Sequence, residues 1–334
     1  MIMIIEGTIG RSLRELGWHD EQADQPGVDV LLMELTLHVR RSGTVRPWLG
    51  PAFRGVVARR MKDAQCRHDP IDRETTWVYC AGCPFNASCA YGRLFEPDGA
   101  VSGEEHPGFA NGQRGVVLAM QFPVPELVMR DDRLRMTVKV VGRESMRLGE
   151  LMVEAIAGAG ESSGIGPDHV LFSIEEVEAR SLRLRAADLP RSVPDDAHRL
   201  TRVGIRLNSP LFLRSRTLSE TSPVVDPSLR MLMAGAVRTV SRALQVNGVP
   251  MDADYAGLID AASGAKLINA SWMPFRQRRW SSRKMSRFDA EGSIGGGTWS
   301  DVPLPLIPWL HWGGLLHVGM HRVAGAGGWR IELS

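Results

Sequence analysis

The chain has 334 residues and a mass of 36.8 kDa, a length typical of about two domains. Hydrophobic residues make up 43% and charged residues 23%, an ordinary globular composition that excludes wholesale disorder. No apolar run reaches the roughly 18 residues that span a bilayer, and the first residues lack the basic region and cleavage site of a secretory signal. We therefore expect a soluble, cytoplasmic protein with no membrane partner.

The first half of the chain predicts a β-α-β-β-α-β order. Alternating or β-branched apolar runs predict strands, and apolar positions at helical spacing predict helices. These elements are Val28–Arg40, Phe53–Met61, Val116–Val124, Arg133–Val141, Ser145–Ala157 and Val170–Val177. A short helix is expected at Ser12–Trp18, and a glycine-rich loop at Gly158–Gly166 before the last strand.

The second half predicts the same order again. Its elements are a strand at Leu200–Asn208, a helix at Pro227–Val246, a hairpin joining Leu267–Phe275 to Arg279–Phe288, a helix at Leu304–Leu316, a glycine-rich loop at Val318–Gly328 and a strand at Trp329–Leu333. The repeat predicts an α+β protein of tandem ferredoxin-like (RRM-like) domains with glycine-rich loops, over residues 1–196 and 197–334. That fold hosts many functions, so it decides none by itself.

All four cysteines, Cys66, Cys80, Cys83 and Cys89, fall in one segment of about residues 65–97. Without a secretory signal, thiolate–metal bonding is favoured over disulfides, and the spacing predicts a structural zinc that staples this insertion. His68 is a possible substitute for one thiolate. A four-cysteine site leaves no open coordination position, so no catalytic metal is expected. The alternative is a set of buried free thiols.

Basic residues concentrate toward the C-terminus. The residues from Ala197 onward include 17 basic and 9 acidic side chains, whereas the first 196 include 23 and 29. The densest run contains no acid and includes Trp280; its basic members are Arg276, Arg278, Arg279, Arg283, Lys284 and Arg287. This run predicts phosphate contacts with a nucleic acid, with a merely solvated charge run as the alternative.

The loop at Val318–Gly328 contains Gly319, Gly325 and Gly327. Glycines permit close backbone approach, so its amide groups are candidates to cradle an RNA phosphate. The sequence Gly160-Glu-Ser162-Ser-Gly164 matches the nucleophile-elbow pattern. Because it links a helix to a strand, the reverse of the required order, a serine hydrolase is discounted.

Four segments together resemble the RAMP-superfamily endoribonucleases that process CRISPR precursor RNA. They are Leu49-Gly-Pro-Ala-Phe-Arg-Gly55, the stretch from Cys80-Ala-Gly-Cys83 to Glu96, the arginine run leading into Gly292-Ser-Ile-Gly295, and Leu315-Leu-His317-Val-Gly319 with Gly325-Ala-Gly327. The resemblance extends from about residue 29 to residue 333, and it rests on the order of these motifs rather than on any single one.

This resemblance implies metal-independent cleavage of a repeat RNA, in which a 2′-hydroxyl attacks the adjacent phosphate and leaves a 2′,3′-cyclic phosphate and a 5′-hydroxyl. Family members often place a catalytic histidine at or near the first helix, which makes His38 and His68 candidates. His321, in the glycine-rich loop, is a third. The tyrosine that some members carry at the start of the first helix has no match here, because Pro51 and Phe53 occupy that stretch.

Two other interpretations stay open at this point. The chain is alternatively a non-catalytic RAMP-type subunit that holds guide RNA within a CRISPR effector complex, using the same arginines and glycines. It is otherwise a zinc-stapled interaction protein with no RNA role. Replacing Arg278, Arg279 and Arg283 with alanine would then leave nucleic-acid affinity and its salt dependence unchanged.

Overall fold

The computed structural model describes residues 26–66, 80, 83–97, 115–194, 200–216, 221–281 and 286–333. It divides into two compact units, Met1–Arg183 and Leu184–Ser334, each with its own antiparallel sheet and helices. The fold is therefore mixed α+β, as predicted. Within the described part of the chain, no helix combines the length and apolar character needed to span a membrane.

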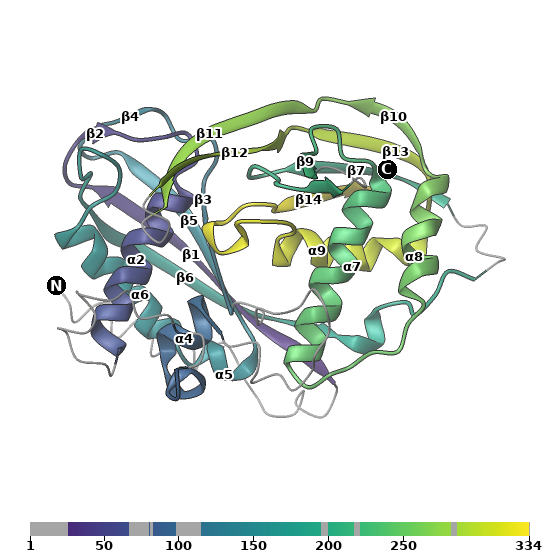
Figure 1. The fold of residues 1–334 in the computed structure, drawn as a ribbon, viewed down its shortest axis with the longest axis horizontal. Coiled ribbons are helices and arrows are strands. Elements are labelled where there is room, and N and C mark those ends of the chain that lie inside the picture. The colour runs from purple at the N-terminus through teal and green to yellow at the C-terminus, as the bar shows by residue number, and fades with distance from the viewer. Residues whose placement is uncertain are drawn as a thin grey trace. The chain divides into compact units, whose positions relative to one another are not determined.

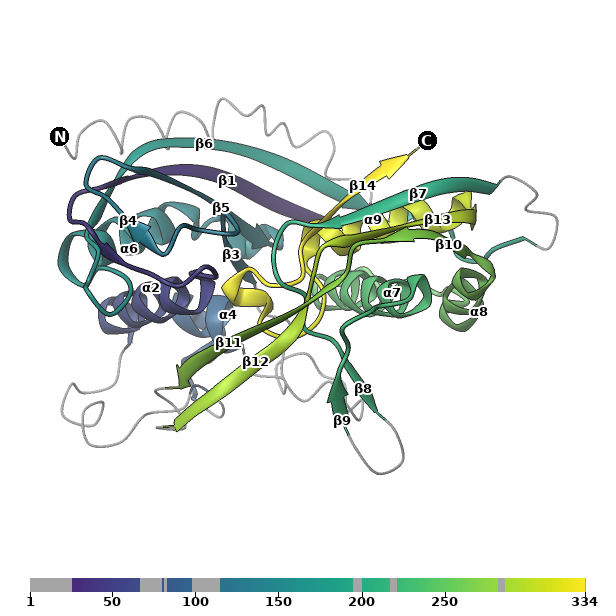
Figure 2. The same cartoon turned by 90° about the horizontal axis from the view of Figure 1, so that it is seen from above.

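The sheet of the first unit has the strand order β3-β5-β1-β6, and α2 and α6 lie together on one of its faces (Figures 1 and 2). The elements of this unit are β1 (Gly27–Val39), β2 (Gly43–Thr44), α2 (Gly50–Gln65), α4 (Ala90–Phe95), β3 (Val116–Met120), β4 (Leu127–Val128), β5 (Arg133–Val141), α5 (Arg143–Met146), α6 (Gly149–Ser162) and β6 (Phe172–Arg185). This order is consistent with the predicted ferredoxin-like unit. The expected helix at Ser12–Trp18 lies outside the described residues.

Register explains why the second half of β1 has one apolar and one polar face. Leu35 pairs with Met136 and Leu37 with Leu134, and all four side chains are buried on the helix side. The alternate residues face the other way, because successive side chains of a strand point to opposite faces. His38 is one of these.

The predicted glycine loop at Gly158–Gly166 is wrong over its first half, because α6 continues to Ser162. Gly160 lies inside the helix, and a Cβ atom there would collide with the carbonyl oxygen of Phe172 on β6. The glycine therefore permits close helix–strand packing. Phe172 in turn stacks on Phe53 of α2, with ring centroids 5.4 Å apart.

The sheet of the second unit has the order β10-β13-β7-β14. The elements are β7 (Leu200–Leu207), β8 (Arg214–Arg216), β9 (Thr221–Pro223), α7 (Leu229–Val246), α8 (Tyr255–Ala261), β10 (Lys266–Ala270), β11 (Met273–Ser281), β12 (Ser286–Ile294), β13 (Gly296–Pro303), α9 (Ile307–Leu316) and β14 (Trp329–Leu333). Helices α7 and α9 pack closely at Gly313, where a Cβ atom would collide with Ala236 of α7.

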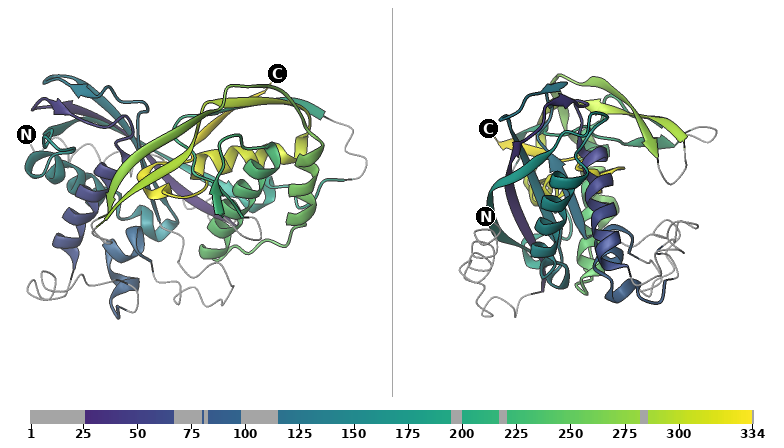
Figure 3. Two further views of the ribbon diagram at one scale, coloured as in Figure 1. Left: turned by 45° about the horizontal axis from the view of Figure 1, so that its top comes forward. Right: turned by 90° about the vertical axis from the view of Figure 1, so that its left-hand side faces the viewer.

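The predicted hairpin is correct in kind but wrong in its strands. The residues at Lys266–Ala270 pair with β13 inside the sheet, and the hairpin is instead formed by β11 and β12. Figure 3 shows that this hairpin extends beyond the sheet from β10 and β13. The predicted strand Leu267–Phe275 is therefore divided between β10 and β11, and Gly295, at a φ of 103°, separates β12 from β13.

Candidate functional site

His38 lies near the end of β1, on the polar face of the first sheet. Its cross-strand neighbour is Arg133 of β5, and its side chain is 21% exposed. The ring is therefore held by its surroundings yet still reachable from solvent. Two polar contacts of the His38 ring are defined. Of the other two candidate catalytic histidines, His321 has a different environment and His68 lies outside the described residues.

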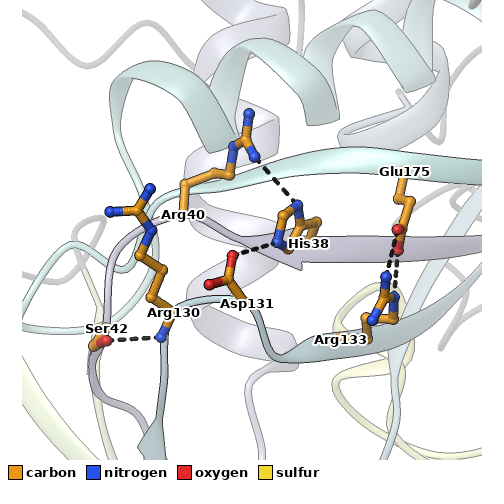
Figure 4. Close-up of polar contacts among 7 residues, drawn as sticks. All are labelled: His38, Arg40, Ser42, Arg130, Asp131, Arg133 and Glu175. Carbon is orange, nitrogen blue, oxygen red and sulfur yellow. Dashed lines mark hydrogen bonds and ion pairs between the residues drawn. The ribbon is translucent and has the colours of Figure 1, made fainter.

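The imidazole of His38 lies between a carboxylate and a guanidinium (Figure 4). Nε2 is 2.9 Å from Oδ1 of Asp131, and Nη1 of Arg40 is 3.3 Å from Nδ1. An ionised carboxylate only accepts hydrogen bonds and a guanidinium only donates them. With Nε2 donating to the carboxylate and Nδ1 accepting from the guanidinium, the lone pair lies on Nδ1, the arrangement that a proton acceptor needs.

A second ion pair stands next to this group on the same sheet. Arg133 donates Nε and Nη2 to the two carboxylate oxygens of Glu175 at 2.6 and 2.7 Å. This bidentate pair lowers the pKa of Glu175 below its ordinary value, chiefly through the hydrogen bond. On the other side, the amide of Arg130 donates to Oγ of Ser42 at 2.7 Å, which ties the β4–β5 turn to the end of β1.

His321 occupies a different environment. It adopts a left-handed conformation (φ 62°), and its ring meets the ring of Phe212 edge to face at a centroid distance of 5.2 Å. Nearby His317 is buried, and its Nδ1 is 3.0 Å from the carbonyl oxygen of Ala326. The loop is thus closely packed against its own unit.

Two of the three loop glycines predicted to bind RNA use their amides internally. Gly325 donates to the carbonyl of Arg322 and Gly327 to that of Pro210, both at 2.9 Å. All three have positive φ, and a Cβ atom on Gly319 would lie 2.5 Å from the carbonyl oxygen of Phe212. The loop therefore needs its glycines for its own packing, whatever it binds.

The arginine hairpin is less cationic than its sequence suggests. Arg276 lies opposite Glu291, and Arg278 opposite Asp289, in the β11–β12 register. Asp289 accepts from Nη2 of Arg276 at 2.6 Å and lies 3.6 Å from Nε of Arg278, while Glu291 is 3.1 Å from Nε of Arg276. The run of basic residues contains no acid, but the returning strand supplies two. The backbones of Arg279 and Arg287 belong to the hairpin, and Arg283 and Lys284 lie outside the described residues.

The four cysteines come from neighbouring parts of the first unit. Cys66 directly follows α2, and Cys89 directly precedes α4. The Sγ atom of Cys89 is 3.9 Å from the carbonyl oxygen of Gln65, and the amide of Cys83 donates to the carbonyl of Cys80 at 3.2 Å. Among the described residues, however, no three Cys, His, Asp or Glu side chains are arranged to hold a metal ion.

The cysteine segment also has a protein-only support. Buried Asn86 donates Nδ2 to the carbonyls of Cys80 at 3.0 Å and Glu96 at 2.9 Å, which joins the middle of the segment to its C-terminal end. Burial, followed by the nearby carboxylate of Glu96, raises the pKa of the Cys80 thiol to about 12. Without a bound cation this thiol is therefore protonated at neutral pH.

Sequence reasoning missed Arg40 and Asp131, the two partners of His38. Arg40 had a usable signal, because it follows His38 by two residues in a strand and so shares its face. Asp131 had none, since it lies 93 residues away in the chain and meets His38 only through the pairing of β1 with β5.

The fold is that of the CRISPR RAMP-type, Cas6-like proteins. A Cas6 product complex matches with a TM-score of 0.53 at 12% identity, covering 92% of this chain and 100% of that one. Thermus thermophilus Cas6 matches with a TM-score of 0.50 at 11% identity, covering 92% and 99%. A partial Cas6-RT-Cas1–Cas2 complex matches at 0.52 and 10%, covering 93% and 47%.

The family itself follows from a match to part of the sequence. The family model AF_1859_N, described as an N-terminal domain, matches residues 28–200, slightly more than half of the chain. The chain belongs to this family. No curated protein matches its sequence.

Proposed function

We propose that this protein is a CRISPR repeat-RNA endoribonuclease that cleaves precursor RNA by 2′-hydroxyl attack, with His38 as the proton acceptor. The observation that carries the proposal is the position of the His38 imidazole, whose two ring nitrogens lie 2.9 Å from Asp131 and 3.3 Å from Arg40. The Cas6-like fold of both units supports the choice of substrate. We place this activity on a pair of tandem ferredoxin-like domains.

The chemistry requires a base for the 2′-hydroxyl and a cation for the phosphorane. Nδ1 of His38 takes the hydroxyl proton, O2′ bonds to phosphorus, and the P–O5′ bond breaks. The leaving 5′ oxygen takes its proton from water, and the imidazolium returns its own to solvent. Arg40 is next to Nδ1, where its guanidinium can pair with the phosphate and so leave the nitrogen free.

RNA contact by the β11–β12 hairpin belongs to the same proposal. Arg278 has the looser ion pair, at 3.6 Å from Asp289 compared with 2.6 Å for Arg276, so we expect Arg278 to exchange its carboxylate for a phosphate more readily. The predicted contacts of Arg279, Arg283, Lys284 and Arg287 extend this surface. Other CRISPR proteins are proposed partners, because one structural relative is a partial Cas6-RT-Cas1–Cas2 complex.

We also propose a structural zinc on Cys66, Cys80, Cys83 and Cys89. The proximity of Cys89 to Gln65, and the influence of the Cys83 and Cys89 thiols on the pKa of Cys80, support it. The residues described do not form the ligand geometry by themselves, so binding has to draw the thiols together and deprotonate them. Elemental analysis of the purified protein tests this: one zinc per chain supports it, and none contradicts it.

The test of the activity is incubation with an end-labelled repeat RNA in EDTA, resolved on a denaturing gel. We expect one cut that yields a 2′,3′-cyclic phosphate and that disappears when the nucleotide before the cut is 2′-deoxy. Tight binding of an RNA that stays intact would contradict the enzyme and favour a guide-RNA-holding subunit.

A further inference from the structure

The turn that carries Asp131 is strained at that one residue. Asp131 has a φ of 74°, in the left-handed region that non-glycine residues seldom occupy. Aspartate tolerates this region better than most residues, but glycine or asparagine would occupy it at least as easily. A carboxylate kept in such a conformation calls for a reason, and local strain of this kind is often found at functional sites.

The surrounding hydrogen bonds leave Asp131 little freedom. The amide of Asp132 donates to the carbonyl of Met129 at 3.1 Å, and a carboxylate oxygen of Asp132 accepts from the amide of Met129 at 2.8 Å. The turn is joined to β1 by Asp131 N to Val39 O and by Val39 N to Asp132 O, both at 2.9 Å. The turn thus fixes the backbone of Asp131, from which the carboxylate extends to His38.

The carboxylate meets the His38 ring at the nitrogen that Arg40 does not contact. Oδ1 of Asp131 meets Nε2, while the guanidinium of Arg40 meets Nδ1, as Figure 4 shows. The side chain of Asp131 is 73% exposed, so packing against other residues does not require an aspartate at this position. Its one described side-chain partner is the histidine.

We propose that Asp131 is a positioning residue that fixes His38 in the tautomer with the proton on Nε2, and so keeps Nδ1 as the proton acceptor. Its role in cleavage rests on the proposed function, whereas the tautomer is a property of the free protein. During the reaction the carboxylate keeps the Nε2 proton in place while Nδ1 receives the proton of the 2′-hydroxyl. Without the carboxylate the ring keeps its contact with Arg40 but loses the acceptor at Nε2, so it can carry its proton on Nδ1, and Nδ1 then has no lone pair with which to act as the base.

The experiment uses the full chain with Asp131→Gly and Asp131→Asn. Both replacements suit a φ of 74°, so the turn is preserved while the carboxylate is removed. Glu126→Gln is the matched control, because it removes one exposed acid from the neighbouring β4 segment. Thermal unfolding establishes that each variant is folded.

Two readouts are taken. Long-range 1H–15N NMR at about pH 8, where histidine is mainly neutral, reports the tautomer of His38. The His38 signals are assigned as those that disappear in His38→Gln. We expect the Nε2–H form in the parent protein and in Glu126→Gln, and a mixture of both forms in Asp131→Gly. Single-turnover cleavage should fall roughly 10- to 100-fold in Asp131→Gly with RNA affinity unchanged, the size of loss typical when the partner that orients a metal-bound histidine is removed.

The outcomes separate the two proposals. A parent protein with the proton on Nδ1, or an unchanged tautomer and cleavage rate in Asp131→Gly, overturns the positioning role. If His38→Gln cleaves normally, the proposed catalytic role of His38 fails, while the tautomer measurement still decides whether Asp131 fixes the ring.

Discussion

Replacing Asp289 with asparagine should strengthen RNA binding by the hairpin. Asp289 neutralises part of two cations, since it lies 2.6 Å from Arg276 and 3.6 Å from Arg278. The hydrogen bond from Arg276 holds the pKa of Asp289 below its usual range, so the carboxylate is ionised at neutral pH. Asparagine keeps the shape of the side chain and releases one positive charge to the RNA.

The size of the effect follows from counterion release. Each further phosphate that a protein neutralises steepens the slope of log affinity against log salt by about 0.7 on single-stranded nucleic acid. Over a fourfold rise in salt, the variant should therefore lose about 2.6-fold more affinity than the parent protein. Fluorescence anisotropy with a labelled repeat RNA at several salt concentrations measures both the affinity and the slope.

The matched control is Asp301→Asn, which releases Lys266 from a 3.1 Å ion pair in the same unit but outside the hairpin. Its affinity and salt slope should equal those of the parent protein. An unchanged slope in Asp289→Asn would refute the proposed contact between the hairpin and RNA. A weaker complex would instead mean that Asp289 orders the arginines for binding.

Three further variants test the fold around the site. Asn86→Ala should lower the free energy of unfolding by about 1–3 kcal/mol, because it removes the hydrogen-bond donor to the carbonyl groups of Cys80 and Glu96. An unchanged urea midpoint would contradict this. Gly327→Ala should cost at least about 2 kcal/mol, since φ is 78° and the Cβ atom would collide with Val318; equal thermal stability would refute it. Hydrogen bonds from Thr44 lower the pKa of Asp168, so Asp168→Asn should destabilise the protein above about pH 4 and match the parent in stronger acid; a pH-independent difference in urea unfolding would contradict this.

Local patterns predicted elements more reliably than they predicted contacts. The Val- and Leu-rich composition of Val28–Arg40 identified a strand, and the repeated element order agrees with the two observed sheets. The glycines of α6 were misread because a glycine that permits helix–strand contact looks the same in sequence as one that ends a helix. Gly160 was assigned to a loop for this reason.

The site depended on pairing that the sequence does not display. The arginine run was recognised, but its charge was overestimated, because Asp289 and Glu291 come opposite Arg278 and Arg276 only through the β11–β12 register. His38 was one of three candidate histidines, and what distinguishes it is Asp131, contributed by a turn 93 residues away. Such long-range partners follow from topology, and one sequence has no local signal for them.

The central claim is that His38 accepts the proton of the attacking 2′-hydroxyl, and single-turnover cleavage of a repeat RNA in EDTA tests it most directly. Loss of a general base typically costs about 10²- to 10⁴-fold in rate, so His38→Ala should cut at least about 100-fold more slowly while binding RNA as tightly as the parent. His311→Ala, which removes an exposed histidine of α9, should cut at the parent rate. Equal rates for His38→Ala and the parent protein would contradict the account.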